Sequence, residues 1–205
     1  MEAILKKFSA LSTPSISDAL EGRNNLDFSI KPLDENYRLC GRAMTVKAPV
    51  GDNLIILQAL RQSEPGKVLV VDMKGETYRS VMGDFMVTLA KNLGFLGLVF
   101  DGVVRDIQEI KALNFPVFCK GICIAASSKA GGGEIDVPIS CGGVAINPGD
   151  IIVGDANGVV VVPKEREDRI LTEALLKEEK DEKRLLQYGV NRETAREYLD
   201  SLFKN

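Results

Sequence analysis

The sequence contains no histidine. This absence excludes the Ser–His and Cys–His nucleophile pairs of many hydrolases, and it removes the imidazole ligands that most zinc and copper sites use. Acid–base chemistry in this chain must therefore use carboxylates, lysine, tyrosine, cysteine or water. A bound metal would have oxygen ligands, which favours a hard cation such as Mg²⁺ or Mn²⁺.

The chain also lacks a long apolar run, a basic surface and a paired cysteine motif. No apolar run reaches the length of a membrane span, and residues 1–15 are too few and too charged for a secretory signal, so we expect a cytoplasmic protein with no membrane partner. A net charge of −3 and a pI near 5.2 argue against a nucleic-acid partner. The cysteines are interpreted as core residues without a disulfide framework. They are Cys40, Cys119, Cys123 and Cys141.

The 205 residues include 45% hydrophobic and 27% charged side chains, which is enough to bury one sizeable core. We predict a single domain over residues 1–205, with a core at about 12–163 and a charged helical tail over 164–205. The tail contains KEEKDEKR, a composition more typical of a solvated helix face than of a binding surface.

Strand and helix patterns alternate from Ala43 onwards. The expected strands are 43–48, 67–73, 96–100 and 116–121, and the expected helices are 52–60, 83–94 and 106–114. This alternation predicts a layered α/β fold with a mainly parallel sheet. Further along, turn signals at 131–133, 148–149 and 157–158 surround short β-rich runs, which indicates a β-hairpin layer.

Near the start of the chain, Ser15-x-x-Asp18 fits a capping box, with Pro14 just before it. We therefore expect a short opening helix that begins at Ser15 and is closed by Gly22. The segment that follows it shows no regular pattern.

Two expected strand-to-helix loops carry the candidate site, because ligands of open α/β sheets bind beyond the carboxyl ends of the strands. Gly83-Asp84-Phe85-Met86 opens a helix, and the free N–H groups and positive dipole end of that helix suit a carboxylate or phosphate. The second loop, 101–106, ends in Arg105-Asp106. There the guanidinium can grip a carboxylate bidentately while the neighbouring carboxylate holds a hard cation.

Each of these residues also has a purely structural interpretation. Asp106-x-x-Glu109 is a capping-box pattern, and in the local sequence alone such an aspartate is more often only an N-cap. Asp84 can serve only to stabilise the first turn of its helix, and Arg105 can be a surface ion-pair partner. Asp101 is interpreted as a turn residue.

The spacing of Asp84, twenty further residues and Arg105-Asp106 resembles the hallmark of the 4-hydroxy-4-methyl-2-oxoglutarate aldolase family, which shares its fold with the regulator of ribonuclease activity A proteins. The similarity covers most of residues 12–163. It includes SISDAL, GDNLIILQAL, PGKVLVVD, GDFMVTLAKNLGFLGLVFDGVVRD, FPVF and VPISCGGVAINPGDIIVGDANGVVVVP. The resemblance implies a layered α/β sandwich of the swivelling β/β/α type, and it favours the functional interpretation of the Asp and Arg-Asp residues.

The resemblance further implies a divalent-metal-dependent aldolase that releases pyruvate and also decarboxylates oxaloacetate. Asp106 would bind Mg²⁺ or Mn²⁺, largely together with water. Arg105 and the amides of Gly83, Asp84, Phe85 and Met86 would bind the pyruvate-like end of the substrate. Asp84 would act as a base through a water. None of these steps requires a histidine.

The resemblance also implies homotrimers, sometimes stacked as hexamers, with sites near subunit boundaries and an acidic residue from a neighbouring subunit. Glu178, Glu179 and Glu182 are available in the tail for that role, and the sequence does not choose among them.

Three other functions stay open. The first is a non-catalytic regulator that binds ribonuclease E on the same fold, although a protein-binding role would not require the full Asp and Arg-Asp pattern. The second is a Schiff-base aldolase, whose nucleophile would be Lys47, Lys74, Lys91 or Lys120. The third is a lyase or decarboxylase for a different 2-oxo acid, because fold does not fix substrate.

Overall fold

The computed structural model describes residues 2–203. Its central feature is a nine-stranded sheet in the order β1-β5-β4-β3-β2-β10-β11, with β6 paired to β4 and β7 to β2. The strands are β1 (Lys31–Pro32), β2 (Leu39–Lys47), β3 (Lys67–Glu76), β4 (Gly97–Val104), β5 (Val117–Cys119), β6 (Gly121–Ile122), β7 (Glu134–Ile135), β8 (Ile139–Cys141), β9 (Val144–Ile146), β10 (Ile151–Asp155) and β11 (Gly158–Val162). The helices are α1 (Ala3–Phe8), α2 (Thr13–Ala19), α3 (Leu54–Gln62), α4 (Asp84–Asn92), α5 (Ile107–Ala112), η1 (Lys164–Arg166), α6 (Glu167–Tyr188) and α7 (Arg192–Leu202).

The predicted α/β fold is confirmed. Strands β2, β3, β4 and β5 are parallel neighbours, and helices α3, α4 and α5 follow them as the sequence pattern indicated. The hairpin layer has two parts: β8 and β9 form a separate antiparallel sheet, whereas β10 and β11 extend the main sheet beside β2. Because β10 pairs with residues 39–42, β2 begins four residues earlier than the predicted strand at 43.

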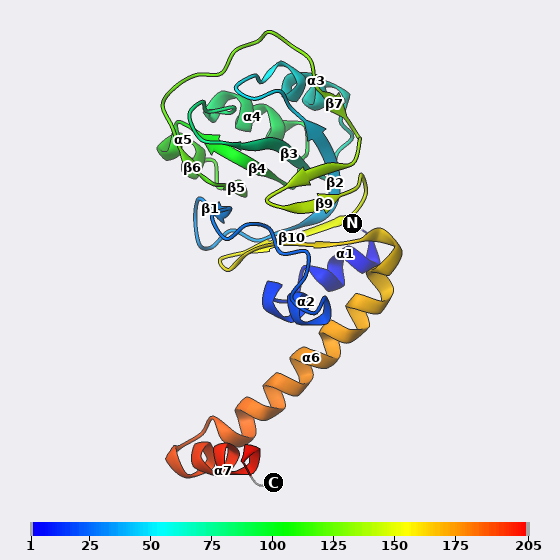
Figure 1. The fold of residues 1–205 in the computed structure, drawn as a ribbon, viewed down its shortest axis with the longest axis vertical. Helices are drawn as coiled ribbons and strands as arrows, with labels where there is room; N and C mark the ends of the chain where they lie inside the picture. Colours follow the sequence, from blue (N-terminus) through cyan, green and yellow to red (C-terminus); the bar gives the residue numbers. More distant parts are fainter. Residues whose placement is uncertain (1, 204–205) are drawn as a thin grey trace.

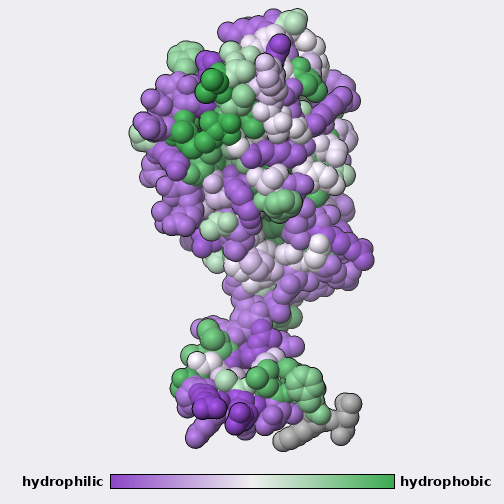
Figure 2. All heavy atoms as spheres, turned by 60° about the vertical axis from the view of Figure 1, so that its left-hand side comes forward, coloured by the Kyte–Doolittle hydropathy of each residue, from purple (hydrophilic) through white to green (hydrophobic). Residues whose placement is uncertain are grey.

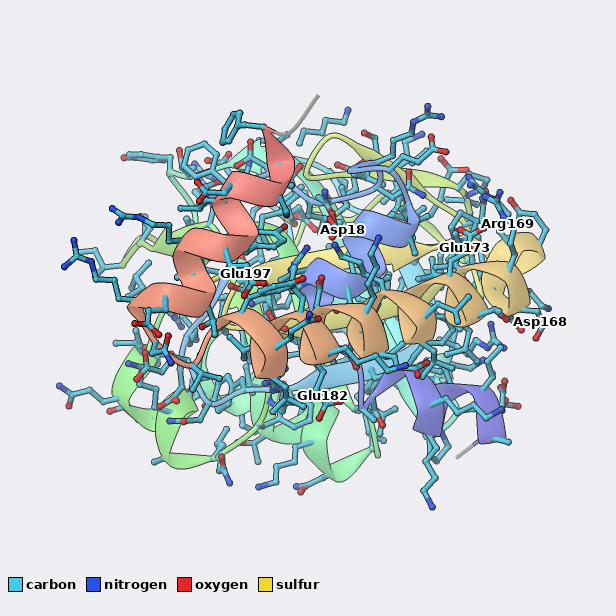
Figure 3. The ribbon with its side chains drawn as sticks, turned by 90° about the horizontal axis from the view of Figure 1, so that it is seen from below. Asp18, Asp168, Arg169, Glu173, Glu182 and Glu197 are labelled. Carbon is cyan, nitrogen blue, oxygen red and sulfur yellow. The ribbon has the colours of Figure 1, made fainter. Side chains whose placement is uncertain are left out.

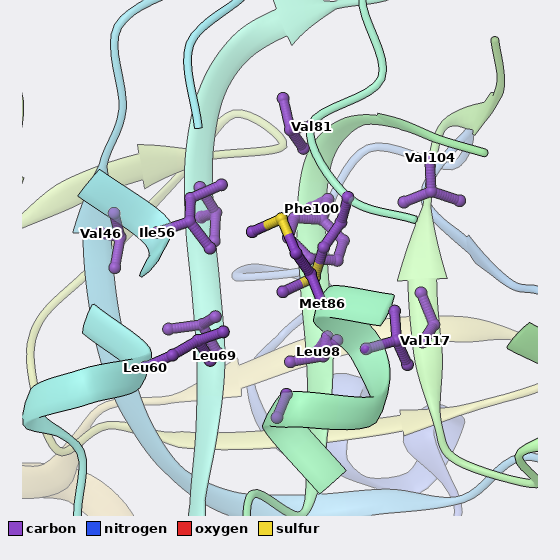
Figure 4. Packing of buried hydrophobic residues seen from close by; sticks show 14 of the residues in the cluster. Val46, Ile56, Leu60, Leu69, Val81, Met86, Leu98, Phe100, Val104 and Val117 are labelled. Atoms are coloured by element: carbon purple, nitrogen blue, oxygen red, sulfur yellow. The ribbon is translucent and has the colours of Figure 1, made fainter. Parts of the chain in front are cut away.

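The parallel strands are apolar on both faces, as expected for strands that are covered on both sides. In β3, Leu69 and Val71 face the helices, and Val68 and Val70 face the opposite cluster, which includes β8 and β9. On the helical face, Ile56 of α3 packs into the same cluster (Figures 1 and 4). Helices α4 and α5 pack into this cluster too, and this packing fixes their first turns beyond the carboxyl ends of β3 and β4.

A third cluster joins α1, α2 and the first half of α6 to the β10–β11 hairpin. The predicted capping box at Ser15 is wrong, because α2 begins at Thr13 and its N-cap is Ser12, whose side chain accepts a hydrogen bond from the Ser15 N–H. Pro14 therefore lies inside the first turn, where its missing N–H has no intrahelical partner to lose.

Asp155 connects α2 to this hairpin. Its buried carboxylate accepts hydrogen bonds from the Thr13 N–H (3.0 Å), the Thr13 hydroxyl (2.7 Å) and the Asn157 N–H (2.8 Å). Burial alone would raise the pKa of Asp155, but the hydrogen bonds outweigh burial and hold the pKa below its usual value of 3.8.

We expect Asp155→Asn to lower the free energy of unfolding by about 1–3 kcal/mol at neutral pH, because the amide cannot accept all of these hydrogen bonds. A lowered folded-state pKa adds stability that is fully present above the unfolded value and is lost as pH falls through the folded value. Urea denaturation of both proteins from pH 7 to pH 3 should therefore show a difference that shrinks at the acid end. A difference that is independent of pH would contradict this role.

The C-terminal helices form an arm that leaves the body of the molecule (Figure 1). Only the first half of α6 contributes buried residues, the last of them Ala174. Charged side chains such as Asp168, Arg169, Glu173 and Glu182 project from α6 (Figure 3). The arm also exposes large apolar side chains, and Figure 2 shows hydrophobic surface at this end of the molecule. The exposed apolar side chains of the arm are those of Leu175, Leu176, Leu185, Leu186, Val190, Leu199, Leu202 and Phe203.

Within residues 2–203, no helix has both the length and the apolar character needed to cross a membrane. The four cysteines are free thiols. Cys119 and Cys141 are core residues as interpreted from the sequence, whereas Cys40 and Cys123 are half-buried.

Candidate functional site

The carboxyl ends of β3 and β4 lie side by side, and two main-chain hydrogen bonds join the segment that follows β3 to the end of β4 and to the residue after it. The Val81 N–H donates to the Val103 carbonyl (3.1 Å), and the Arg105 N–H donates to the Met82 carbonyl (3.0 Å). These bonds place Gly83, at the start of α4, directly beside the end of β4. The two segments predicted from the sequence to carry the site, 83–86 and 101–106, therefore lie in contact.

A cleft of about 300 Å³ opens at this junction. All the predicted site positions line it: Gly83, Asp84, Phe85, Met86, Arg105 and Asp106. Phe85 is 69% exposed, whereas the Met86 side chain belongs to the core beneath. A hollow of 280 Å³ between α2 and β11 is lined by Asp18 and Asp27 and by no basic residue. The cleft, not this hollow, combines acidic and basic groups at the strand ends.

Asp106 is held in an unusual conformation. Its φ is 59°, in the left-handed region that few residues other than glycine adopt, so the surrounding structure must hold it there. Asp106 occupies the N-cap position of α5, but its side chain makes no capping hydrogen bond, so its interpretation as a helix cap is wrong. Its Oδ2 instead lies 3.4 Å from Nε of Arg105.

Gly83 leaves the space that this carboxylate occupies. A Cβ at position 83 would lie 2.2 Å from Oδ2 of Asp106 and 3.3 Å from Nε of Arg105. The φ of Gly83 is −123°, so the backbone itself would accept any residue. The need for glycine at this position therefore comes from the close approach of Asp106 and Arg105.

The first turn of α4 faces the cleft. Its first intrahelical hydrogen bond runs from the Val87 N–H to the Gly83 carbonyl (3.1 Å), so the N–H groups of Asp84, Phe85 and Met86 have no intrahelical acceptor. Together with the positive end of the helix dipole and the half-exposed Arg105, they can bind a carboxylate. Asp84 occupies the first helical position and adds a second carboxylate to the cleft.

The acidic side chains of the cleft suit a hard divalent cation and do not suit a structural zinc ion. Among residues 2–203, no three acidic or cysteine side chains come together as a metal-binding group. The cleft offers the carboxylates of Asp84 and Asp106. This set suits Mg²⁺ or Mn²⁺, which bind through one or two carboxylates plus water and substrate, and it does not suit a structural zinc ion with four protein ligands.

Asp101 is a buried residue of β4, so its interpretation as a turn residue is wrong. Its Oδ1 lies 2.7 Å from Nζ of Lys120, and its Oδ2 accepts a hydrogen bond from the Gly142 N–H (3.1 Å). This contact with Asp101 raises the pKa of the Lys120 amine. A Schiff-base nucleophile requires the opposite, a lowered pKa.

The other lysines considered as nucleophiles also lie outside the cleft. Lys47 pairs with Glu134 (3.2 Å), and Nζ of Lys91 donates to the Leu113 carbonyl (2.6 Å). Lys74 does not line the cleft either. The lysine that does line it is Lys129, at its exposed rim.

The tail glutamates differ in their contacts. Glu178 accepts a hydrogen bond from the Ser12 N–H (2.8 Å), and Glu179 pairs with Lys183. Glu182 makes no such contact with residues 2–203, and Figure 3 shows it on the outside of α6. The arm extends from the side of the body opposite α4 and α5 (Figure 1), so these carboxylates do not reach the cleft of their own chain.

The remaining polar residues of the cleft were not predicted as site residues. They are Asn53, Ser80, Ser127 and Lys129. Asn53 was included in an expected helix, whereas it is the residue just before α3. Ser127 and Lys129 lie in a segment without periodicity, and only the tertiary fold brings them to the strand ends.

The chain is similar to proteins that are described as enzymes and to proteins that are described as regulators. Residues 13–161 match the model of the RraA-like family, described as Aldolase/RraA. A protein of Halalkalibacterium halodurans named "Putative 4-hydroxy-4-methyl-2-oxoglutarate aldolase" is 50% identical over 198 residues, which are 97% of this chain and 94% of that protein.

Solved structures show the same fold. An uncharacterized protein from Pseudomonas syringae has a TM-score of 0.82 at 28% identity, with 96% of both chains covered. RraAS2 of Streptomyces coelicolor, described as an unusual member of the RNase ES inhibitor RraA protein family, has a TM-score of 0.79 at 28% identity. That match covers 89% of this chain and 96% of the other.

Proposed function

The chain belongs to the RraA-like family, Aldolase/RraA, and on that premise we propose that it is a lyase that cleaves a carbon–carbon bond next to a 2-oxo acid and releases pyruvate. The substrate is 4-hydroxy-4-methyl-2-oxoglutarate or a related 2-oxo acid. The observation that carries this proposal is the Asp106 carboxylate, held in a left-handed conformation against Gly83 and beside Arg105. The name of the 50% identical relative supports it.

The pyruvate-like end of the substrate binds at the first turn of α4. The N–H groups of Asp84, Phe85 and Met86 donate to its carboxylate, and Arg105 adds a charged, bidentate contact. These donors are fixed by the helix and by the hydrogen bonds that join Val81 and Met82 to β4. The substrate is therefore oriented before any bond breaks.

Asp106 would hold the divalent cation of the site, Mg²⁺ or Mn²⁺, together with water. When bound, that cation supplies the positive charge that stabilises the pyruvate enolate. Gly83 keeps the carboxylate in position, because any larger residue there would displace it.

Asp84 accepts the proton of the substrate's 4-hydroxyl group through a water. As that proton leaves, the bond between C3 and C4 breaks, C4 becomes a ketone, and the electron pair moves to the 2-oxo group to give the enolate of pyruvate. Protonation of C3 then completes pyruvate. Oxaloacetate reaches the same enolate by losing CO₂, so the cleft decarboxylates oxaloacetate as well.

Exposed apolar residues at the start of α4, around β6 and just after β3 support assembly of several copies into a trimer or hexamer. Tyr78, Phe85, Ile122 and Ile124 are between 52% and 91% exposed, and the Cys123 thiol donates to the Tyr78 carbonyl (2.7 Å), which joins two of their segments. Large apolar side chains that are exposed on adjoining segments are typical of an interaction surface. In such an assembly the arm of one copy can bring Glu182 towards the cleft of another.

A regulator of ribonuclease activity is the second candidate function, and the likeness to RraAS2 supports it. The two functions are separable by experiment. Asp106→Asn should abolish lyase activity, whereas binding to ribonuclease E in a pull-down should be unchanged if the protein also has that role. Parallel loss of both would mean that the cleft itself is the ribonuclease-binding surface.

Pyruvate release tests the proposed function. Purified protein is incubated with 4-hydroxy-4-methyl-2-oxoglutarate or oxaloacetate, with Mg²⁺, with Mn²⁺ or with excess chelator. We expect pyruvate from both substrates, loss of activity with chelator, and recovery when the metal is restored. Activity that resists the chelator, together with a lysine adduct trapped by borohydride in the presence of pyruvate, would instead establish the Schiff-base mechanism.

A further inference from the structure

One wall of the cleft is formed by a segment that belongs to no helix or strand. This segment, residues 124–133, which we call the strap, leads from β6 to β7 around the end of the molecule where α3 and α4 lie (Figure 1). Its residues Ala126, Ser127 and Lys129 line the cleft. The proposed reaction uses no group of the strap, although a ligand in the cleft would lie against it.

The strap adds nothing to the hydrophobic core. None of the residues 124–133 is buried, and no side chain of the strap belongs to any of the three core clusters. Its one large apolar side chain, Ile124, is 91% exposed. Moving the strap therefore uncovers little apolar surface, so the free energy of that motion depends mainly on hydrogen bonds.

Hydrogen bonds hold the strap to the body at two points. At the first, the Ala125 carbonyl accepts from both the N–H and the hydroxyl of Ser80, each at 2.8 Å. At the second, the Ser128 N–H donates to the Gly51 carbonyl (2.7 Å), and the Ser128 carbonyl accepts from the Asn53 N–H (3.1 Å). A few polar contacts thus decide whether this wall of the cleft stays in place.

Asp52 strengthens the second point. Its carboxylate accepts hydrogen bonds from the Leu54 N–H in the first turn of α3 (3.0 Å), from the Ser128 hydroxyl (2.8 Å) and from the Ala130 N–H. Asp52 is 3% exposed and does not line the cleft. It can therefore act on a bound ligand only through the strap that it holds.

Three consecutive glycines follow this attachment. Gly131, Gly132 and Gly133 have φ of 95°, 93° and 97°, which other residues rarely adopt. A Cβ at Gly133 would lie 2.5 Å from the Lys47 carbonyl, so this residue is fixed against β2. A Cβ at Gly131 or Gly132 would meet no atom closer than 3.4 Å. The chain at 131–132 has the conformational freedom and the space of a hinge.

We propose that the strap is a movable wall of the cleft, that Asp52 is the latch that keeps it closed, and that a ligand in the cleft stabilises the closed position. This inference rests on the proposed function of the cleft and adds a gate for its ligand. Opening breaks the hydrogen bonds from Ser128 and Ala130 to Asp52 and turns the chain at the hinge. A bound ligand opposes opening because it contacts the strap only in the closed position. Asp52 is a positioning residue.

Limited proteolysis with trypsin measures the opening, because trypsin cleaves after lysine and Lys129 lies in the strap. When opening and closing are fast, the rate of cleavage follows the population of the open form. Cleavage after Lys129 is followed by mass spectrometry, and cleavage after the exposed Arg192, in the arm, is the internal reference. The probe ligand is oxalate with Mg²⁺, because oxalate has the planar shape and the charge of the pyruvate enolate.

Oxalate at ten times its dissociation constant should slow cleavage after Lys129 about 10-fold in the wild-type protein, as expected for a ligand that binds only the closed form. Without ligand, Asp52→Ala should speed this cleavage roughly 10-fold or more, and Ser128→Ala, which removes one hydroxyl and leaves α3 untouched, roughly 3-fold. Gly132→Ala should speed it too, because alanine adopts the closed φ of 93° only with strain. Cleavage after Arg192 should not change.

Asp150→Ala is the matched control. Asp150 is 1% exposed and, like Asp52, accepts hydrogen bonds from main-chain N–H groups, those of Asn147 (2.8 Å) and Lys164 (3.0 Å), but it lies away from the cleft. Its loss should lower overall stability without changing the ratio of cleavage at Lys129 to cleavage at Arg192. An equal rise in this variant would mean that Asp52→Ala acts through general destabilisation, and the latch would be disproved.

Two further results would overturn the proposal. Equal cleavage of the wild-type, Asp52→Ala and Ser128→Ala proteins would show that Asp52 is no latch. Oxalate that binds in calorimetry without protecting the strap would show that closure is not coupled to the ligand. If calorimetry detects no oxalate binding with Mg²⁺ or Mn²⁺, the proposed function fails and the coupling fails with it, whereas the comparison of variants without ligand still decides whether the latch exists.

Discussion

Asp106→Asn is expected to lower kcat/KM for pyruvate release by about 10³-fold, which corresponds to ~4 kcal/mol of transition-state stabilisation. The amide has nearly the shape of the carboxylate, but it lacks the negative charge that holds a hard cation. The substrate can still bind to the first turn of α4 and to Arg105, so the loss should appear mainly in kcat.

This variant should leave the fold intact. Asparagine adopts left-handed backbone conformations as readily as aspartate does, so the φ of 59° at position 106 is no obstacle. The ion pair with Arg105 is partly exposed and contributes little to stability. Thermal melts of the two proteins should therefore nearly coincide.

Asp136→Asn is the matched control. Asp136 also has a left-handed backbone, with φ of 53°, but it lies outside the cleft, between β7 and β8. The same chemical change there should leave pyruvate release unchanged. Equal activity of the Asp106 and Asp136 variants, each compared at saturating Mg²⁺ and Mn²⁺, would contradict a metal-binding role for Asp106.

Gly83→Ala is expected to lower kcat/KM by about 100-fold although alanine is not part of the chemistry. The new Cβ would lie 2.2 Å from Oδ2 of Asp106, so that carboxylate must turn away. Turning the end of a side chain costs little free energy. A displaced metal ligand, in contrast, costs much of the activity, because catalysis depends on positions fixed to within about 1 Å.

The stability of Gly83→Ala should therefore change far less than its activity. Alanine is a poorer N-cap than glycine, so we expect a loss of about 1 kcal/mol or less in the free energy of unfolding. That corresponds to a drop of about 2–4 °C in Tm for a chain of this size. Ser12→Ala is the control, because it removes a helix cap away from the cleft and should lower Tm without lowering kcat/KM. Full activity in Gly83→Ala would show that catalysis does not require the Asp106 carboxylate in the position observed.

The central part of the fold could be predicted from the sequence because its signals are local. In β3, a nearly unbroken apolar run between Pro65-Gly66 and a polar segment is typical of a strand covered on both faces, and the structure confirms it. The capping residue of α2 was predicted three residues too late, because Ser15 and Ser12 can both cap a helix and only the hydrogen bond distinguishes them.

The site could likewise be predicted only where its signals are local in the sequence. Gly83 and Arg105-Asp106 were found because both segments follow strands, where ligands of parallel sheets bind. The conformation of Asp106 and its contact with Gly83 depend on the packing of two loops more than twenty residues apart, which no local pattern encodes. Lys129 lines the cleft in a segment whose neighbouring residues, Ser128 and Ala130, donate hydrogen bonds to the buried Asp52, a tertiary contact that no local pattern encodes.

The most direct test of the central claim is the exchange of the methyl protons of pyruvate with D₂O, followed by proton NMR. This exchange reports formation of the enolate without any bond cleavage. We expect exchange that requires Mg²⁺ or Mn²⁺, stops with chelator, and falls by about 10³-fold in Asp106→Asn but not in Asp136→Asn. Exchange that persists with chelator or in the Asp106 variant, or no exchange with any of these metals, would contradict enolate formation at this cleft.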